Sequence, residues 1–385
     1  MSPLESLARS VALVSLIFVT TVTAEPLQLD GQLDEPEWAQ AERLDDFVTV
    51  MPLTRAAPAV RTEVRVLARE EGLYLGVWCE QPADVPRTRH PTTRDVQARA
   101  DRLNVMIDFD GRGVTAYELT VSLSGGIQDA QITGQNQFNY DWDGRWEQAV
   151  AEDEAGWTVE MRLPWSLAAQ SGAEDGRRQI GLYLSRFVEV TGRRYSIPGY
   201  DFEHPTFVAD MRKLNIPAFT QGHWSVVPYV AISNDRLSAR QDTRVGADLF
   251  WSPNSQHQLS LALQPDFGQV ESDDLVVNFN AIETFFSEKR PFFTENQALF
   301  DVPVGNGALL INTRRIGAAP DTGNAGVTDV DVAAKYTGNS AAMDWGLLVA
   351  NEADTVSDTS VALGRSFHAL RGRWRREMLD TGYTL

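Results

Sequence analysis

The run from Asn139 to Trp146 concentrates residue types that recognise sugars. Within eight residues it holds two tryptophans and a tyrosine beside carboxylate, amide and guanidinium groups. Aromatic faces stack on the apolar side of a sugar ring, and polar groups hydrogen-bond its hydroxyls. The Asp, Asn and Gly content predicts an exposed loop. The predicted carbohydrate-binding residues are Tyr140, Asp141, Trp142, Asp143, Arg145, Trp146 and, elsewhere in the chain, Trp78.

Packing is the alternative role for these tryptophans. Trp142 and Trp146 are also suited to cap a hydrophobic core. Trp78 lies on the face of its strand opposite its apolar neighbours. Three further tryptophans are expected to serve packing alone, namely Trp38, Trp157 and Trp165.

Four oxygen-bearing side chains lie close together between residues 101 and 110. Carboxylate and amide oxygens are the ligands that Ca²⁺ prefers. The sequence therefore offers a structural calcium site made of Asp101, Asn104, Asp108 and Asp110. The last two alternate with apolar residues, so a solvated strand face explains them equally well.

Catalytic motifs are not found. The five histidines are scattered, and no zinc-protease, nucleophile-elbow or phosphate-loop pattern occurs. With so many carboxylates, a pair at the separation used by glycosidases can arise in any fold, which makes that signal non-specific. No catalytic residue is assigned.

Composition narrows the possible partners. The 385 residues suggest two domains, and 34 Lys plus Arg against 53 Asp plus Glu leave a net charge of −19. A nucleic-acid partner is not expected, because no basic surplus is available to displace phosphate counterions. The single cysteine, Cys79, excludes an internal disulfide and is expected to be buried as a small hydrophobe.

Residues 1–24 are predicted to form a signal peptide. Arg9 precedes an apolar run from Val11 to Val22, and small residues occupy the usual cleavage positions up to Ala24. The run is too short for a confident membrane-spanning helix. We therefore expect the chain to be exported from the cytoplasm.

Residues 25–222 are predicted to form a β-sandwich. Short runs alternate apolar and polar residues, a period that indicates strands, and Arg69 to Gly72 marks a hairpin turn. Only a short helical turn is expected, near residues 164–169. The alternating runs lie at residues 64–68, 73–77, 103–109, 117–123, 157–163 and 180–184.

Residues 223–385 are predicted to form longer strands. Two hairpins are expected, with turns at residues 252–255 and 337–340, and each strand has about ten residues with one apolar and one polar face. Membrane-spanning strands and a soluble antiparallel sheet both fit this pattern. Between the hairpins, phenylalanines flank Glu288, Lys289 and Arg290. This segment is either an aromatic-anchored loop with mutually paired charges or a constriction inside a barrel.

Two sets of motifs resemble known families. Leu29-Asp-Gly-Gln-Leu-Asp-Glu-Pro-Glu-Trp38, Leu73-Tyr-Leu-Gly-Val77, Gly156-Trp-Thr-Val-Glu-Met-Arg-Leu-Pro-Trp165 and Tyr183-Leu-Ser-Arg186 resemble the family 9 carbohydrate-binding module, a β-sandwich. Gln264-Pro-Asp-Phe-Gly-Gln-Val-Glu271, Glu283-Thr-Phe-Phe-Ser-Glu-Lys-Arg-Pro-Phe-Phe293 and Asn312-Thr-Arg-Arg-Ile-Gly317 are similar to domain-of-unknown-function family 5916, outer-membrane β-barrels that carry such a module.

The resemblance implies an all-β chain with a carbohydrate-binding-like sandwich, followed by antiparallel strands of an incomplete outer-membrane β-barrel. It also implies structural calcium, which such modules often bind, and a sandwich located in the periplasm. Family members are much longer, so the end at Leu385 leads us to expect a fragment.

Three functions follow from these expectations. The first is oligosaccharide binding at the outer membrane, accessory to carbohydrate uptake or catabolism. The second is a glycoside hydrolase or its accessory subunit. The third is a structural periplasmic domain without a sugar site.

Overall fold

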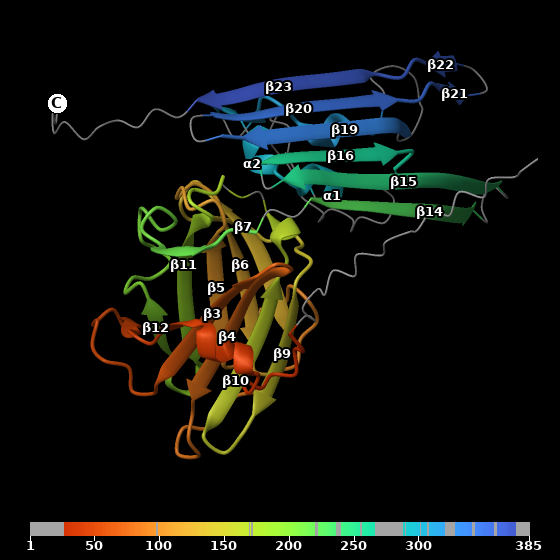
Figure 1. The fold of residues 1–385 in the computed structure, drawn as a ribbon. Coiled ribbons are helices and arrows are strands. Elements are labelled where there is room, and N and C mark those ends of the chain that lie inside the picture. Colours follow the sequence, from red (N-terminus) through yellow and green to blue (C-terminus); the bar gives the residue numbers. More distant parts are fainter. Residues whose placement is uncertain are drawn as a thin grey trace, which may run out of the picture.

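The structure is a computed structural model, and its described residues fall into two β units (Figure 1). It describes residues 27–97, 99–168, 170, 172–219, 222–235, 240–254, 256–265, 288, 290–300, 302–305, 308–319, 328–340, 343–357 and 360–374. The predicted signal peptide lies outside these residues, as do residues 266–287 and Lys289.

The first unit is a sandwich of two antiparallel sheets. The five-stranded sheet has the order β1-β3-β4-β10-β9, and the eight-stranded sheet has the order β2-β12-β11-β5-β6-β7-β8, with β13 also paired to β11. The predicted β-sandwich and the short helical turn, η2, are confirmed. The elements are η1 (Pro36–Gln40), β1 (Glu42–Leu44), β2 (Val48–Met51), β3 (Thr62–Arg69), β4 (Gly72–Glu80), β5 (Arg102–Asp108), β6 (Ala116–Ser122), β7 (Ile127–Thr133), β8 (Gln137–Asn139), β9 (Glu147–Glu152), β10 (Gly156–Leu163), η2 (Trp165–Leu167), β11 (Arg177–Val188), η3 (Glu189–Thr191), β12 (Arg193–Ile197) and β13 (Arg212–Pro217).

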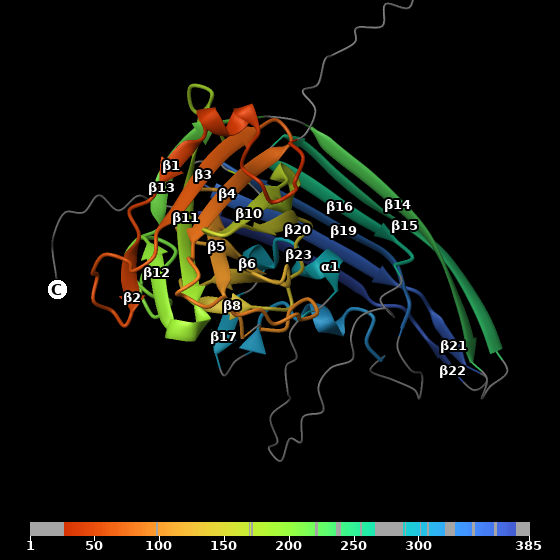
Figure 2. The ribbon, with the colours of Figure 1, turned by 90° about the horizontal axis from the view of Figure 1, so that it is seen from below.

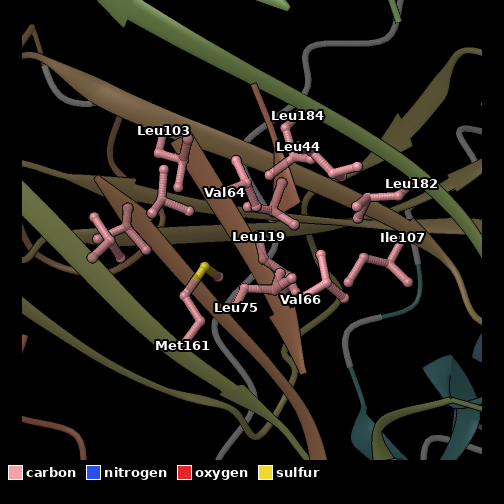
Figure 3. Close-up of a cluster of buried hydrophobic side chains, with 14 of the residues drawn as sticks. Leu44, Val64, Val66, Leu75, Leu103, Ile107, Leu119, Met161, Leu182 and Leu184 are labelled. Atoms are coloured by element: carbon pink, nitrogen blue, oxygen red, sulfur yellow. The ribbon is translucent and has the colours of Figure 1, made fainter. Parts of the chain in front are cut away.

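Period-two alternation builds the core between the sheets (Figure 3). In β5, Leu103, Val105 and Ile107 are buried in the main hydrophobic cluster, whereas the residues between them lie on the outer face of the sheet. Cys79 belongs to the same cluster and is fully buried, as predicted. Its burial raises the pKa of the thiol to about 11.

The loop between β8 and β9 packs its tryptophans inward. Trp142 and Trp146 are only 6% and 8% exposed. The ring of Trp142 lies 4.7 Å from that of Tyr117, and a Cβ added at Gly144 would come within 2.5 Å of the Trp142 ring. Trp146 Nε1 donates to Asp129 Oδ2 at 2.7 Å. The exposed stacking positions predicted for both tryptophans are therefore corrected, because these indoles cap the sandwich core.

The N-terminal segment is tied to the outer face of the five-stranded sheet. Glu160 Oε2 accepts hydrogen bonds from the backbone N–H groups of Asp30 and Gly31 at 3.0 and 2.8 Å. Trp38 Nε1 donates to Glu160 Oε1 at 3.2 Å and to Glu35 Oε2 at 3.1 Å, so two carboxylates share one indole N–H. Burial raises the pKa of Glu160 to about 7.

The second unit is an antiparallel sheet of six strands in the order β14-β15-β16-β19-β20-β23. Both predicted hairpins are confirmed as β15–β16 and β19–β20. Among the described residues the sheet is open, with β14 and β23 at its edges. The elements are β14 (His223–Asp235), β15 (Arg240–Asn254), β16 (His257–Leu263), α1 (Pro291–Thr294), α2 (Gln297–Phe300), β17 (Pro303–Gly305), β18 (Ala308–Leu309), η5 (Thr313–Arg315), β19 (Val330–Asn339), β20 (Met343–Glu352), β21 (Thr355–Ser357), β22 (Ser360–Ala362) and β23 (Ser366–Trp374).

The two faces of this sheet differ in polarity. Residues paired across neighbouring strands share a face of the sheet. One side is therefore defined by a row of successive partners, which includes Trp224, Trp251, Leu259, Leu347 and Leu370. That side, which we call the apolar face, has large exposed hydrophobic residues. They are Trp224, Val226, Val230, Val245, Trp251, Leu263, Leu347, Leu370 and Trp374.

The opposite side, which we call the inner face, is covered by the segment that contains α1 and α2. Arg290 forms a bidentate pair with Glu288, with both nitrogen–oxygen distances at 2.7 Å, and both side chains are buried. Lys335 of β19 donates to the carbonyls of Phe292 and Glu295. For its described residues, the interpretation as an aromatic-anchored loop with mutually paired charges is confirmed.

The six-stranded sheet lies across one end of the sandwich (Figures 1 and 2). Arg112 of the sandwich donates to Asp344 Oδ1 at 3.1 Å and to the carbonyl of Ser340 at 2.9 Å. Asn339 Nδ2 donates to the carbonyl of Gln170 at 3.2 Å. Polar contacts therefore join the two units.

No helix in the described part of the chain is long and apolar enough to cross a membrane.

We predict that Glu160→Gln removes a pH dependence of stability. The folded-state pKa of Glu160 lies above the usual 4.5, so folding takes up a proton between about pH 4.5 and 7, and stability falls as the pH rises through this window. From pH 4 to pH 8, the free energy of unfolding of the wild type should fall by about 3 kcal/mol relative to the variant. Denaturant titrations at several pH values test this. As a control, Glu154→Gln changes an exposed carboxylate and should keep the pH dependence of the wild type. A difference in stability between the wild type and Glu160→Gln that does not change with pH would contradict the assignment.

We also predict that Trp142→Ala and Trp146→Ala each destabilise the sandwich by about 3–5 kcal/mol, because each leaves a core cavity. The matched control is Tyr140→Ala, since Tyr140 lies in the same loop and is half-exposed. Denaturant unfolding followed by circular dichroism measures the effect. Unfolding midpoints equal to that of the wild type would show that the indoles are not part of the core.

Candidate functional site

Polar side chains gather on the outer face of the eight-stranded sheet. Arg102 and Asn104 of β5, Glu118 and Thr120 of β6, and Arg194 of β12 form what we call the outer-face cluster. Each alternates along its strand with a core residue, so the strand period that fills the core also assembles this cluster. The five side chains are between 3% and 8% exposed.

Hydrogen bonds link the cluster across four strands. Asn104 Nδ2 donates to Glu118 Oε1 at 3.0 Å and to Thr120 Oγ1 at 2.6 Å. Arg194 Nη1 donates to Asn104 Oδ1 at 3.3 Å and to Ser185 Oγ of β11 at 3.1 Å. These bonds fix the direction in which each polar group points.

Two buried atoms of the cluster keep unused hydrogen-bonding capacity. Among the described residues, Glu118 Oε2 and Arg194 Nε find no hydrogen-bond partner. Burial raises the pKa of Glu118, against the opposing effect of its hydrogen bonds, and lowers the pKa of Arg194. Buried polar atoms without partners are costly, and a polar ligand able to reach them would recover part of that cost.

Aromatic side chains border the cluster. Tyr140 is 48% exposed, and its ring is nearly parallel to that of Phe138 at a centroid distance of 6.1 Å. The Arg194 guanidinium lies 4.1 Å from the centre of the Phe202 ring, and that of Arg102 lies 4.2 Å from the Phe187 ring. Burial, and then the nearby Glu118 carboxylate, raise the pKa of Tyr140 to about 12.

The other polar residues of the predicted loop face a different space. Asp141, Asp143 and Arg145 line a cavity of about 300 Å³ between the sandwich and the inner face of the six-stranded sheet. We call it the interdomain cavity. The edge of Trp142 also contributes to its wall. The structure thus separates the predicted sugar-binding residues. Tyr140 lies beside the outer-face cluster, whereas Asp141, Asp143 and Arg145 line the interdomain cavity. Trp142 and Trp146 belong to the core, and Trp78 lies on the outer side of the five-stranded sheet.

A smaller cavity of about 110 Å³ lies next to the interdomain cavity, and Ser166 and Phe250 line both. Asp110 lines this smaller space. Burial, followed by the neighbouring Asp108 carboxylate, raises the pKa of Asp110 to about 7. Arg112 N donates to Asp110 Oδ1 at 3.1 Å.

The four predicted calcium ligands are not brought together. Asp101 is fully buried and accepts from Gln81 Nε2 and from two backbone N–H groups. Asn104 belongs to the outer-face cluster, whereas Asp108 Oδ2 accepts from the Gly113 N–H and from Lys213 Nζ. The predicted ligand set is therefore corrected, because Asp101 and Asn104 bind separate local partners and only the carboxylates of Asp108 and Asp110 are neighbours.

Two other carboxylate groups lie within ligand distance of one another in the described residues. Asp95, Asp129 and Asp143 surround the guanidinium of Arg94, which already supplies positive charge. The second group joins Asp30, Glu35 and Glu160, whose carboxylates bind the N-terminal segment as described above. Calcium binding stays a prediction, without the ligands first assigned to it.

Most residues of the outer-face cluster were not predicted from the sequence. Arg102, Glu118, Thr120 and Arg194 were passed over, although each stands at an outward position of an alternating strand. That signal was available within β5 and β6. The pairing of β5 with both β6 and β11, which brings the cluster together, is a long-range property of the fold.

Comparisons with known proteins agree with this division into two units. Residues 29–194 match a family described as carbohydrate family 9 binding domain-like, and residues 223–344 match a domain of unknown function, DUF5916. No curated protein matches the chain.

Two solved structures resemble the chain at low identity. One is a family 9 carbohydrate-binding module from Caldicellulosiruptor kristjanssonii in complex with cellotriose, with 12% identity, a TM-score of 0.35, and coverage of 50% of this chain and 90% of that one. The other is a putative carbohydrate-binding protein from Bacteroides uniformis, with 8% identity, a TM-score of 0.37, and coverage of 46% and 87%. On the family matches and the fold, the chain consists of a family 9 carbohydrate-binding-like domain followed by a DUF5916 region.

Proposed function

We propose that the protein binds oligosaccharide at the outer-face cluster of its sandwich. The observation that carries this proposal is the combination of unsatisfied buried polar atoms, on Glu118 and Arg194, with the exposed ring of Tyr140 at their border. The match of residues 29–194 to a carbohydrate-binding-like family supports the same ligand class.

The cluster has the chemistry that sugar recognition requires. A carboxylate accepts hydrogen bonds from hydroxyls, a guanidinium donates to them, and an amide does both. A flat aromatic ring at the border covers the apolar face of a pyranose. Because few groups take part, binding is expected to be weak, with specificity set by the fixed directions of the polar groups.

We predict that Tyr140→Ala weakens glycan binding about tenfold, because it removes the stacking surface. Tyr140→Phe keeps the ring and should bind nearly as well as the wild type. The full chain is first screened on an oligosaccharide array with and without calcium, and affinities for the best glycan are then measured by calorimetry. Equal affinity of the Ala variant and the wild type would argue against the outer-face site, and a folded chain that binds no glycan would refute the function.

We further propose that the six-stranded sheet associates with the outer membrane through its apolar face. Leu370, Trp224 and Trp374 are 82%, 71% and 76% exposed on this face. Exposed hydrophobic surface of this extent is typical of an interface with a protein or a lipid. The inner face carries the polar and charged side chains, which is the division found in strands of outer-membrane proteins.

Aromatic residues of the apolar face lie at the end of the sheet nearest the sandwich. Trp224 pairs with Trp251, and Trp345 pairs with Gly338 beside the contact between Asn339 and the sandwich. Tryptophan is enriched at the boundary between lipid and water. This arrangement supports a membrane boundary on the sandwich side. We propose that the sandwich then lies in the periplasm and that the protein serves oligosaccharide uptake or breakdown.

We predict that Leu370→Lys reduces association with lipid, because a charge on the lipid-facing side costs about 2–4 kcal/mol at mid-membrane depth. The matched control is Leu53→Lys, which changes a leucine of the sandwich that is 57% exposed and should leave association with lipid unchanged. Flotation of the full chain with phosphatidylcholine vesicles measures the effect. If both variants float as the wild type does, the apolar face does not contact lipid.

A further inference from the structure

We propose that the interdomain cavity is a second carbohydrate-binding site, built jointly by the sandwich loop and the inner face of the six-stranded sheet. The inference rests on the proposed function in one respect, namely that the ligand of this chain is a sugar. It concerns a different set of residues, and it gives the DUF5916 region a direct part in binding.

The cavity has the size of a small-ligand site. Its volume of about 300 Å³ falls at the lower end of the range for ligand pockets. Asp141 and Arg145 approach from the sandwich, and Ser225, Asp248 and Ser260 approach from the inner face of strands β14, β15 and β16. Two protein surfaces therefore offer polar groups to the same space.

Three charged groups of the lining remain available to a ligand. Among the described residues, the side chains of Asp141, Arg145 and Asp248 form no hydrogen bond or ion pair. Asp143 and Glu295 differ from them, because Asp143 pairs with Arg94 and Glu295 accepts from Gln258 and Ser260. Burial raises the pKa of the Asp248 carboxyl with no partner to oppose it.

This set of groups suits a neutral sugar. Adjacent hydroxyls of a pyranose can donate to Asp141 or Asp248 and accept from Arg145, so all three free side chains gain partners at once. An anionic ligand would meet the carboxylates of Asp141, Asp143, Asp248 and Glu295, against which the lining offers only the guanidinium of Arg145. The lining thus favours a neutral polyhydroxyl compound over an anion.

Aromatic side chains complete the lining. Phe250 of β15 and Phe292 of α1 border the cavity, and Trp142 lines it from the sandwich side. Rings on both sides provide apolar surface for the C–H faces of a pyranose. Polar groups with fixed positions between such surfaces are the usual composition of a sugar site.

The site exists only while the two units keep their relative placement. The contacts of Arg112 with Asp344 and of Asn339 with Gln170 hold the sandwich end against the sheet. A sugar in the cavity would touch both units and so stabilise this placement. Binding here therefore couples the sandwich to the sheet.

Calorimetry on the full chain tests the inference, with cellotriose, xylotriose and maltotriose as probes. For the sugar that binds, we expect two sites per chain in the wild type and one in the double variant Asp248→Asn with Arg145→Gln. Tyr140→Ala should instead weaken binding at the other site about tenfold and leave the cavity site unchanged. Asp331→Asn changes an exposed carboxylate of β19 outside both sites and should leave the stoichiometry at two.

The outcomes separate this inference from the proposed function. The inference is overturned if the double variant leaves the stoichiometry unchanged. It is also overturned if the wild type has a single site and Tyr140→Ala disrupts it; the proposed function then stands. A single site lost only in the double variant supports the cavity and overturns the outer-face site. Absence of binding by a folded chain overturns both.

Hydrogen exchange supplies a second readout that does not depend on stoichiometry. Sugar should slow amide exchange in residues 141–145 and 245–250 of the wild type, and this protection should disappear in the double variant. Protection confined to residues 102–104 and 118–120 would overturn the inference.

Discussion

The carboxylate of Asp129 lies fully buried where the chain crosses from the eight-stranded sheet to the five-stranded sheet, and three donors converge on it. They are the indole of Trp146, the backbone N–H of Gly144 and the guanidinium of Arg94. Burial raises the pKa of this carboxyl to about 6, so the donors must offset much of the cost of keeping it charged near neutral pH. Because the crossing loop carries Tyr140 at one end and Arg145 at the other, this one acceptor positions residues of both candidate sites.

Alternation along the strands decides most of what each unit can do. In the sandwich it sends one set of side chains into the core and the other set to the outer-face cluster. In the six-stranded sheet it separates exposed apolar residues from the polar inner face. A shift of one residue in any pairing would exchange the two faces, so register and function are fixed together.

The strands with regular alternation were predictable, and the sites were only partly so. β5, β6, β10, β15, β16, β19 and β20 were anticipated because half of their residues are apolar at a strict period of two. β7 and β9 were not, since runs such as Gln128 to Gln131 and Glu147 to Ala149 mix polar and small residues. The loop at residues 139–146 was found from its composition, but composition does not say which side of an indole faces solvent. Neither the crossing of the loop over Asp129 nor the cavity between the units has a local sequence signal, because both depend on contacts between distant segments.

The solitary thiol has a practical consequence for chemical biology. Cys79 is fully enclosed by the sandwich core, and its pKa of about 11 leaves almost no thiolate at neutral pH. The native, folded protein is therefore expected not to react with maleimide and similar thiol reagents. A cysteine introduced at either unit's surface becomes a unique attachment point for a fluorophore or spin label, without prior removal of the native residue.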